Sequence, residues 1–176
     1  DRPPAARKLG LGLVPEDRRA DGIFAQLSVR ENASVAALEQ FCRLGYVQAG
    51  IERQQVGGLV ERLKVRTPDQ EQEIAKLSGG NQQKALLARW LLKENLKVLL
   101  IDEPTRGIDV GAKAEIYALL DALAREGLAV VLLSSEMPEI LGLCDRMYVM
   151  CEGRIAAEYG RAQATPEKLL ASALPN

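Results

Sequence analysis

Residues 77–84 have the sequence LSGGNQQK, and residues 98–104 have the sequence VLLIDEP. The first stretch is a Ser-Gly-Gly turn that opens a helix, and its unobstructed backbone N–H groups favour an anion. The second is an apolar strand that ends in Asp102 and Glu103, the carboxylates that a nucleotide-bound Mg²⁺ and an attacking water need. Either stretch alone has an ordinary interpretation, as a helix cap or a solvated strand end. Together, in this order, they indicate nucleoside triphosphate chemistry.

The region before and around the Ser-Gly-Gly turn, residues 23–95, is expected to be mostly helical. Ser28 and Glu31 have the spacing of a capping box, which marks a helix start. Farther along, apolar residues recur at intervals of three and four, and Pro68 is expected to open a short helix. The predicted helices cover residues 29–38, 53–63, 68–75 and 81–93.

The pattern changes after residue 96, where apolar runs suit strands of a parallel sheet covered on both faces. Two such runs flank an amphipathic helix that ends at Gly127, which predicts one right-handed crossover. A short strand is also expected near the start of the chain. The predicted strands cover residues 9–14, 98–101, 129–133, 147–150 and 154–157, and a last helix begins after Thr165. The fold class is therefore α/β, with a parallel sheet and an α-helical subdomain.

The composition is that of an ordinary globular protein, with 47% hydrophobic and 27% charged residues among 176. A net charge of −1 gives no support to nucleic-acid binding. No apolar run approaches the roughly 18 residues of a membrane span. The three cysteines are expected to be reduced thiols. Histidine is absent, which excludes a histidine base, a histidine metal site and a histidine-dependent triad.

The motifs resemble those of the ATP-binding subunits of ABC transporters. Residues 77–82 match the signature motif, residues 99–103 the Walker B strand and residues 107–109 the D-loop. Three sequence variants narrow the resemblance to the second ATPase domain of tandem ATP-binding proteins in bacterial monosaccharide importers of the ribose, galactose and xylose type. These variants are NQQK at 81–84, RGIDVG at 106–111 and SSEMPE at 134–139.

The resemblance implies a partial P-loop NTPase core, the ABC ATPase fold. Residues 1–176 would be the C-terminal fragment of one ATPase domain. Residues 23–95 would be its helical signature subdomain, and residues 96–176 the Walker B half of the nucleotide-binding core. The phosphate-cradling Gly-x-x-x-x-Gly-Lys-Ser/Thr loop is missing from the sequence and is expected upstream. The fragment alone is therefore expected to be inactive, although the full protein would be a transport-coupled ATPase.

The resemblance also assigns nucleotide contacts to the signature motif. Ser78, Gly79 and Gly80 would donate hydroxyl and backbone N–H groups to a γ-phosphate held on the partner domain's P-loop, and Gln82 would belong to the same cofactor-binding set. The alternative is a plain helix cap at Ser78, and the two functions can coexist.

The remaining site residues follow from the Walker B strand and three loops. Asp102 would hold Mg²⁺ through water, and Glu103 would be the catalytic residue that orients or deprotonates the attacking water. Asp109 would contact the partner domain, with capping of the next helix as an equal alternative. Glu16, where the family usually has Gln, is a second metal candidate. Ser135 stands where the family usually has the switch histidine.

Glu16 and Ser135 predict two unequal ATP sites. A carboxylate can bind Mg²⁺ but repels the γ-phosphate, and serine cannot replace a charged imidazole donor. The site that uses this domain's own Walker B strand should therefore be impaired, and the site completed by its signature should be competent. The alternative is that both are ordinary loop residues at a site that has lost full activity.

By resemblance, the cofactors are ATP and Mg²⁺, and the first partner is another ATPase domain, head to tail and expected in the same polypeptide. The helical region 23–95 would dock the membrane permease near residues 16–22. A periplasmic solute-binding protein would act indirectly, and the location would be the cytoplasmic face of the inner membrane. The charges at residues 17–21 are most simply a solvated loop. Two alternatives stay open: a non-transport ABC ATPase acting on ribosomes or DNA, and a regulatory domain that binds nucleotide without hydrolysis.

Overall fold

The computed structural model describes residues 3–175, which fold as two compact units with a boundary between Leu133 and Ser134. The boundary falls inside the range 96–176 that the sequence suggests as one half of the core. Both the helical region 23–95 and the parallel strands belong to the first unit.

The first unit is built on a three-stranded parallel sheet. Helix α1 (Pro3–Lys8) leads into β1 (Leu11–Val14), which pairs with β4 (Val98–Asp102), and β4 pairs with β5 (Ala129–Leu133). The strand order is β1-β4-β5. The predicted early strand and both apolar runs are confirmed as neighbours in one parallel sheet.

The two faces of this sheet differ in burial. Side chains alternate between the two faces along a strand, which places Val14, Leu99 and Ile101 on the same face. Helices α4 and α5 pack against this face, and the three side chains are fully buried. On the opposite face Leu13 is 54% exposed and Val131 47%. The expectation of cover on both faces therefore holds for one face only, within the first unit as described.

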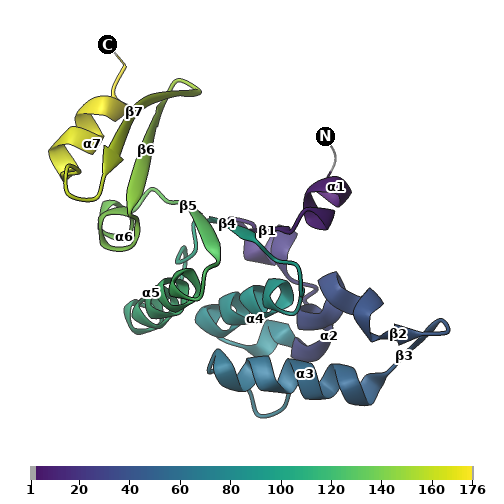
Figure 1. The fold of residues 1–176 in the computed structure, drawn as a ribbon. Helices are drawn as coiled ribbons and strands as arrows, with labels where there is room; N and C mark the ends of the chain where they lie inside the picture. Colours follow the sequence, from purple (N-terminus) through teal and green to yellow (C-terminus); the bar gives the residue numbers. More distant parts are fainter. Residues whose placement is uncertain (1–2, 176) are drawn as a thin grey trace. The chain divides into compact units, whose positions relative to one another are not determined.

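Helices make up most of the rest of the first unit (Figure 1). The predicted capping box is confirmed: the Ser28 side chain accepts from the Glu31 backbone, and the Glu31 side chain accepts from Ser28. The predicted helices near 53–63 and 81–93 are also present, with earlier starts. In chain order the helical segments are a π-helical turn η1 (Arg18–Gly22), α2 (Val29–Ser34), the 3₁₀ segment η2 (Val35–Phe41), α3 (Ala49–Arg62), the 3₁₀ turn η3 (Ile74–Lys76), α4 (Gly79–Leu91) and α5 (Val110–Arg125).

The prediction of a helix that opens at Pro68 is wrong, since only the short turn η3 forms in this region. The backbone before η3 is instead tied to the start of α2. Val29 N donates to Gln72 O at 2.9 Å, and Arg30 N donates to Gln70 O at 2.9 Å. These carbonyls are therefore committed to another segment and are not available for an intrahelical ladder.

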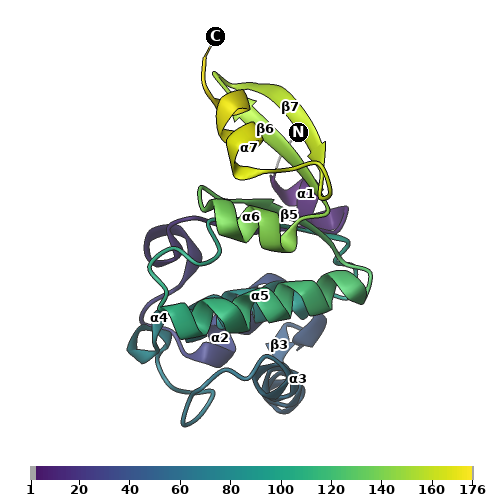
Figure 2. The same cartoon turned by 90° about the vertical axis from the view of Figure 1, so that its left-hand side faces the viewer.

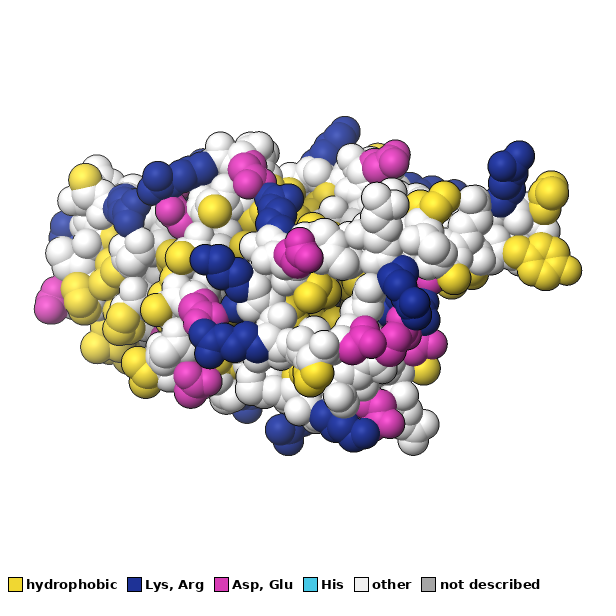
Figure 3. Space-filling model, turned by 90° about the horizontal axis from the view of Figure 1, so that it is seen from below, with side chains coloured by type: hydrophobic (Ala, Val, Ile, Leu, Met, Phe, Trp, Pro, Cys, Tyr) yellow, Lys and Arg dark blue, Asp and Glu magenta, His cyan; other side chains and the backbone are white. Residues whose placement is uncertain are grey.

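A small hairpin between η2 and α3 was not expected from the sequence. Strands β2 (Cys42–Arg43) and β3 (Tyr46–Val47) are joined by a two-residue turn in which Leu44 has φ +52° and Gly45 φ +85°. Such turns need two positive φ values. Leu44 is 92% exposed and Tyr46 81%, and Figure 3 shows hydrophobic side chains at this projecting tip.

Helix α4 is the centre of the first unit. It contacts α2, α3, α5 and β1, and Figures 1 and 2 show it beneath the sheet with α5 alongside. Trp90 packs its ring on Gly12, where a Cβ would lie 2.8 Å from the ring, and its Nε1 donates to Leu13 O at 2.8 Å. The only tryptophan of the sequence therefore fastens α4 to β1.

The second unit consists of α6 (Met137–Leu143), the antiparallel pair β6 (Arg146–Cys151) and β7 (Arg154–Gly160), and α7 (Pro166–Ala173). The two strands predicted near 147–150 and 154–157 are confirmed as this pair, which turns at Glu152 and Gly153, both with positive φ. Thr165 caps α7 by accepting from Lys168 N. Among residues 3–175, no helix combines the length and apolar character that a bilayer crossing would need.

Candidate functional site

The signature turn stands at the start of α4. Ser78 precedes the helix in an extended conformation and is exposed. Its Oγ accepts from Asn81 Nδ2 at 2.9 Å and forms no hydrogen bond with the helix backbone. The side chain therefore does not act as the simple cap, and it lies at a helix N-terminus where an anion is favoured.

The two glycines of the turn have a packing role that sequence reasoning missed. A Cβ on Gly79 would lie 2.5 Å from Arg18 Nη2, and a Cβ on Gly80 would lie 2.7 Å from Ala112 Cβ. The turn is thus pressed against η1 on one side and the first turn of α5 on the other. Larger residues at either position would have to push these elements away.

Gln82 lies inside the protein and not on the surface of the turn. It is 3% exposed, and its Nε2 donates to Ile74 O at 3.3 Å and Leu77 O at 3.2 Å. Its Oε1 accepts from Arg18 Nε at 3.3 Å. Every polar atom of this side chain is engaged, so Gln82 supports the shape of the turn from within.

The Walker B strand delivers two half-buried carboxylates to its carboxyl end. Asp102 is the last residue of β4, and Glu103 follows it with φ +46°. The Glu103 backbone N–H donates to Leu133 O at 2.9 Å on β5. A non-glycine residue in the left-handed region costs about 1–3 kcal/mol, and such residues cluster at functional sites. The backbone strain therefore coincides with the residue expected to handle the attacking water.

Asp109 caps α5. Its Oδ1 accepts from Ala112 N at 2.9 Å, which establishes the capping alternative. The carboxylate also lines a pocket of about 220 Å³ together with Ser78 and Gly80. The D-loop aspartate and the signature turn are 31 positions apart in the sequence, yet they meet at the N-terminal ends of α4 and α5.

Glu16 is exposed and forms an ion pair with Arg106. Beside it, Arg18 reaches three acceptors, the backbone carbonyls of Arg106 (2.7 Å) and Gly107 (3.2 Å) and the side chain of Gln82. The interpretation of residues 17–21 as a solvated loop is therefore wrong for Arg18. The signal that could have found it is the paired glycines, since Gly79 leaves room for its guanidinium.

Ser135 belongs to the second unit, in the exposed turn that follows β5. In that turn Ser134 Oγ accepts from Glu136 N at 3.0 Å. The geometry that brings together Ser78, Gly80 and Asp109 is contained in the first unit and does not include Ser135.

The donor set suits a nucleotide-bound Mg²⁺ and not a metal held by protein alone. Within residues 3–175, no three His, Cys, Asp or Glu side chains gather as a metal cage. Mg²⁺ usually takes one or two carboxylates and completes its shell with water and substrate phosphates. Asp102 at the strand end fits that demand, whereas the Glu16 carboxylate is already paired with Arg106.

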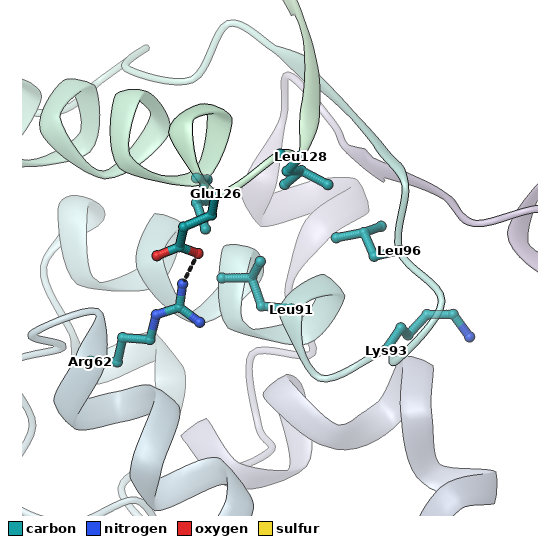
Figure 4. Close-up of a pocket in the computed structure, with 8 residues that line it drawn as sticks. Arg62, Leu91, Lys93, Leu96, Glu126 and Leu128 are labelled. Carbon is teal, nitrogen blue, oxygen red and sulfur yellow. Dashed lines mark hydrogen bonds and ion pairs between the residues drawn. The ribbon is translucent and has the colours of Figure 1, made fainter.

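A second pocket, of about 240 Å³, lies at the opposite ends of α3, α4 and α5 (Figure 4). Arg62 and Glu126 form an ion pair at its rim, beside leucines that include Leu91 and Leu128. None of its lining residues belongs to the signature, Walker B or D-loop segments. This pocket is therefore separate from the nucleotide motifs.

Comparison with known proteins places these motifs in a family. The profile of the ABC transporter family matches residues 3–106. The arabinose import ATP-binding protein AraG of Rhizobium meliloti is 51% identical over 100% of this chain, and the ribose import ATP-binding protein RbsA of Rhodopirellula baltica is 50% identical over 98%. The chain spans about a third of the length of these relatives, 35% and 34%.

Solved structures agree on the fold. The dimeric ATP-binding cassette MJ0796, in a post-hydrolysis state with ADP and Pi, superposes with a TM-score of 0.73 at 21% identity, covering 88% of this chain and 64% of that one. CbiO1 from Clostridium perfringens, part of the ABC transporter complex cbiONQ, gives 0.71 at 25% identity, covering 93% and 60%. With a signature turn, a Walker B strand and a D-loop in one unit of this fold, the chain belongs to the ABC transporter family.

Proposed function

We propose that this chain is part of the ATP-hydrolysing subunit that powers import of a sugar or sugar-like solute across the bacterial inner membrane. The observation that carries the proposal is the meeting of Ser78 and Asp109 in one pocket at the N-terminal ends of α4 and α5. The relatives are named arabinose and ribose import ATP-binding proteins, which supports the solute class.

The signature turn would complete the ATP site of a partner domain. The Ser78 hydroxyl and the backbone N–H groups of Gly79 and Gly80 would donate to the γ-phosphate, with the start of α4 adding its dipole. Gln82 would act from behind the turn, because its polar atoms are bonded within the chain. Asp109 would cap α5 and face the partner domain at once.

The domain's own site would use Asp102, Glu103, Glu16 and Ser135. Asp102 would hold Mg²⁺, which neutralises charge on the phosphates when bound, and Glu103 would orient or deprotonate water. The Arg106 ion pair weakens Glu16 as a metal ligand, and Ser135 lacks the charge of an imidazolium. These features support an impaired site beside a competent one.

The partners proposed are a second ATPase domain, permease subunits and, indirectly, a solute-binding protein, with the subunit at the cytoplasmic face of the inner membrane. The 176-residue chain alone is proposed to lack useful ATP affinity, since its sequence holds no phosphate-cradling loop. Titration calorimetry of the chain with Mg-ATP tests this, and micromolar binding would contradict it.

Reconstitution tests the transport function. The full-length protein would be placed in proteoliposomes with its permease and solute-binding protein, and ATP hydrolysis and uptake would be measured with arabinose, ribose and galactose in turn. We expect at least one of these sugars to accelerate hydrolysis and to accumulate inside. Hydrolysis accelerated by ribosomes or DNA, with no sugar taken up, would support the non-transport alternative.

A further inference from the structure

The loop of residues 15–22 is an ordered turn and not a freely solvated segment. Asp17 Oδ1 accepts from the backbone N–H groups of Arg19 and Ala20, each at 3.0 Å, and thereby fixes the π-helical turn η1. Arg18 is half-buried, in contrast to its exposed neighbour Arg19. The turn therefore presents one arginine to the protein and another to solvent.

Arg18 connects three segments that are far apart in the sequence. Its Nη1 and Nη2 donate to Arg106 O and Gly107 O, 88 and 89 positions away, while Nε donates to Gln82 on α4. Burial lowers the pKa of Arg18, yet a guanidinium remains a cation at neutral pH. All three bonds are therefore donated by a charged group, which makes them stronger than neutral ones.

The second connection runs in the opposite direction. The backbone carbonyl of Arg106 accepts the hydrogen bond from Arg18, and the side chain of Arg106 forms an ion pair with Glu16. Two cross-links thus join residues 16–18 to residues 106–107. We define the Arg18 clamp as these contacts together with the Arg18–Gln82 bond.

The clamp reaches the signature turn directly. A Cβ on Gly79 would lie 2.5 Å from Arg18 Nη2, and Gln82 holds the carbonyls of Ile74 and Leu77 that precede the turn. A displacement of Arg18 would therefore remove support from both sides of Ser78. We propose that Arg18 is a positioning residue that couples the loop of residues 15–22 to the signature turn, with the Glu16–Arg106 ion pair closing the clamp.

This inference rests on the proposed function, because the permease is expected to dock on the helical region 23–95 near residues 16–22. It assigns Glu16 a role that differs from metal binding: its carboxylate fixes the side chain of Arg106 and so holds the segment between Glu103 and Asp109. A movement imposed on the loop would be carried to the turn that contacts the partner's γ-phosphate.

Steady-state hydrolysis by the full-length protein with its permease tests the clamp. Arg18→Gln should lower kcat about tenfold to a hundredfold, because small misplacements of a phosphate-contacting turn have effects of that size. KM for ATP should change less than about threefold. KM reflects interactions that are equal in the ground state and the transition state, and the partner's P-loop would supply these. Arg18→Lys should fail to restore kcat, because an ammonium cannot span three acceptors in a fixed fork.

Arg62→Gln is the matched control, since it removes an arginine from an ion pair at the far pocket and should leave kcat unchanged. Full recovery of kcat in Arg18→Lys would overturn the proposed hydrogen-bond geometry. Equal loss in Arg62→Gln would show a general stability effect and overturn the assignment as well.

Amide hydrogen exchange separates the clamp from the transport proposal, because it needs no activity. In full-length Arg18→Gln, residues 79–82 and 106–109 should exchange at least about tenfold faster than in the unmodified protein. Arg62→Gln should show no such change. Unchanged exchange in Arg18→Gln would refute the clamp, even if transport is confirmed, and faster exchange would support it even if no sugar is transported.

Discussion

At the scale of single residues, the candidate site contains residues that have an unusual backbone conformation or that bond to partners far away in the sequence. Glu103 has φ +46°, although it is neither Gly nor Asn. Its backbone N–H is fixed to Leu133 O, and the Arg106 N–H bonds its carbonyl at 3.2 Å. The neighbouring strand and the following turn therefore hold this residue in a conformation that its side chain disfavours.

This conformation predicts an unusual order of stability among variants of Glu103. Glu103→Gly should be more stable than Glu103→Ala by about 1 kcal/mol, because only glycine adopts a positive φ without steric cost. Elsewhere in regular structure the order is normally reversed. Urea unfolding of the two variants measures the difference, and an alanine variant that is equal or more stable would show that the backbone is not strained.

At this scale the sequence predicted which residue types form the candidate site better than it predicted the directions in which their side chains point. Asp102 follows from the apolar run that precedes it, and Asp109 from its position before a helix. The directions of the Gln82 and Arg18 side chains could not be predicted, because the spacing of residues does not reveal which way a side chain points. A buried glutamine and a surface glutamine look alike in a sequence, and only the bonds to Ile74, Leu77 and Arg18 distinguish them.

At the scale of elements, α4 joins the signature turn to the rest of the first unit. Its buried Lys84 donates to Lys64 O at 3.1 Å and Glu115 Oε2 at 2.6 Å, and the latter bond ties α4 to α5. Gly80 lets the two helices approach, because its missing Cβ would lie 2.7 Å from Ala112 Cβ. The distance between the helices is therefore set at the signature motif itself.

Two glycine substitutions in helices should have opposite effects. Gly80→Ala should lower the free energy of unfolding by about 1–3 kcal/mol, because it overpacks the contact with α5. Gly58→Ala on α3 should raise it by about 0.5–1 kcal/mol, since a Cβ there meets nothing within 4 Å. Thermal and urea unfolding measure both, and a tolerated Gly80→Ala would contradict the close approach.

Elements with a local signal were predicted, and those fixed by distant contacts were not. The capping box of Ser28 and Glu31, and the two strands that flank Glu152 and Gly153, are encoded by residues only a few positions apart. The segment after Pro68 follows the start of α2, because its carbonyls accept from Val29 and Arg30. No local pattern encodes a partner some forty positions upstream.

At the scale of the whole molecule, the charges favour stability at neutral pH. Hydrogen bonds from Ser28 lower the pKa of Glu31, those from Arg30 lower the pKa of Glu71, and those from Lys84 lower the pKa of Glu115. Each folded-state pKa lies below the unfolded value near 4.5. The stabilisation is therefore complete above that pH and is lost as the pH falls through the folded pKa.

The unfolding free energy should accordingly be level between about pH 6 and 8, because the chain has no histidine, and should fall below about pH 4.5. Urea midpoints across this range measure the profile. Glu71→Gln should flatten the acid limb, because the amide does not titrate and the charge-assisted bonds from Arg30 are lost. A steep change near pH 6.5 would contradict the assignment.

The central claim is that this domain's signature serves the competent ATP site, while its own Walker B strand serves the impaired one. Steady-state hydrolysis by the full-length protein with its permease tests it through two variants. Ser78→Arg should abolish most turnover, because the side chain would block the partner's γ-phosphate. Glu103→Gln should lower turnover far less than the roughly 10²–10⁴-fold loss expected when a working site loses its general base. A Glu103→Gln variant as damaged as Ser78→Arg would contradict the account.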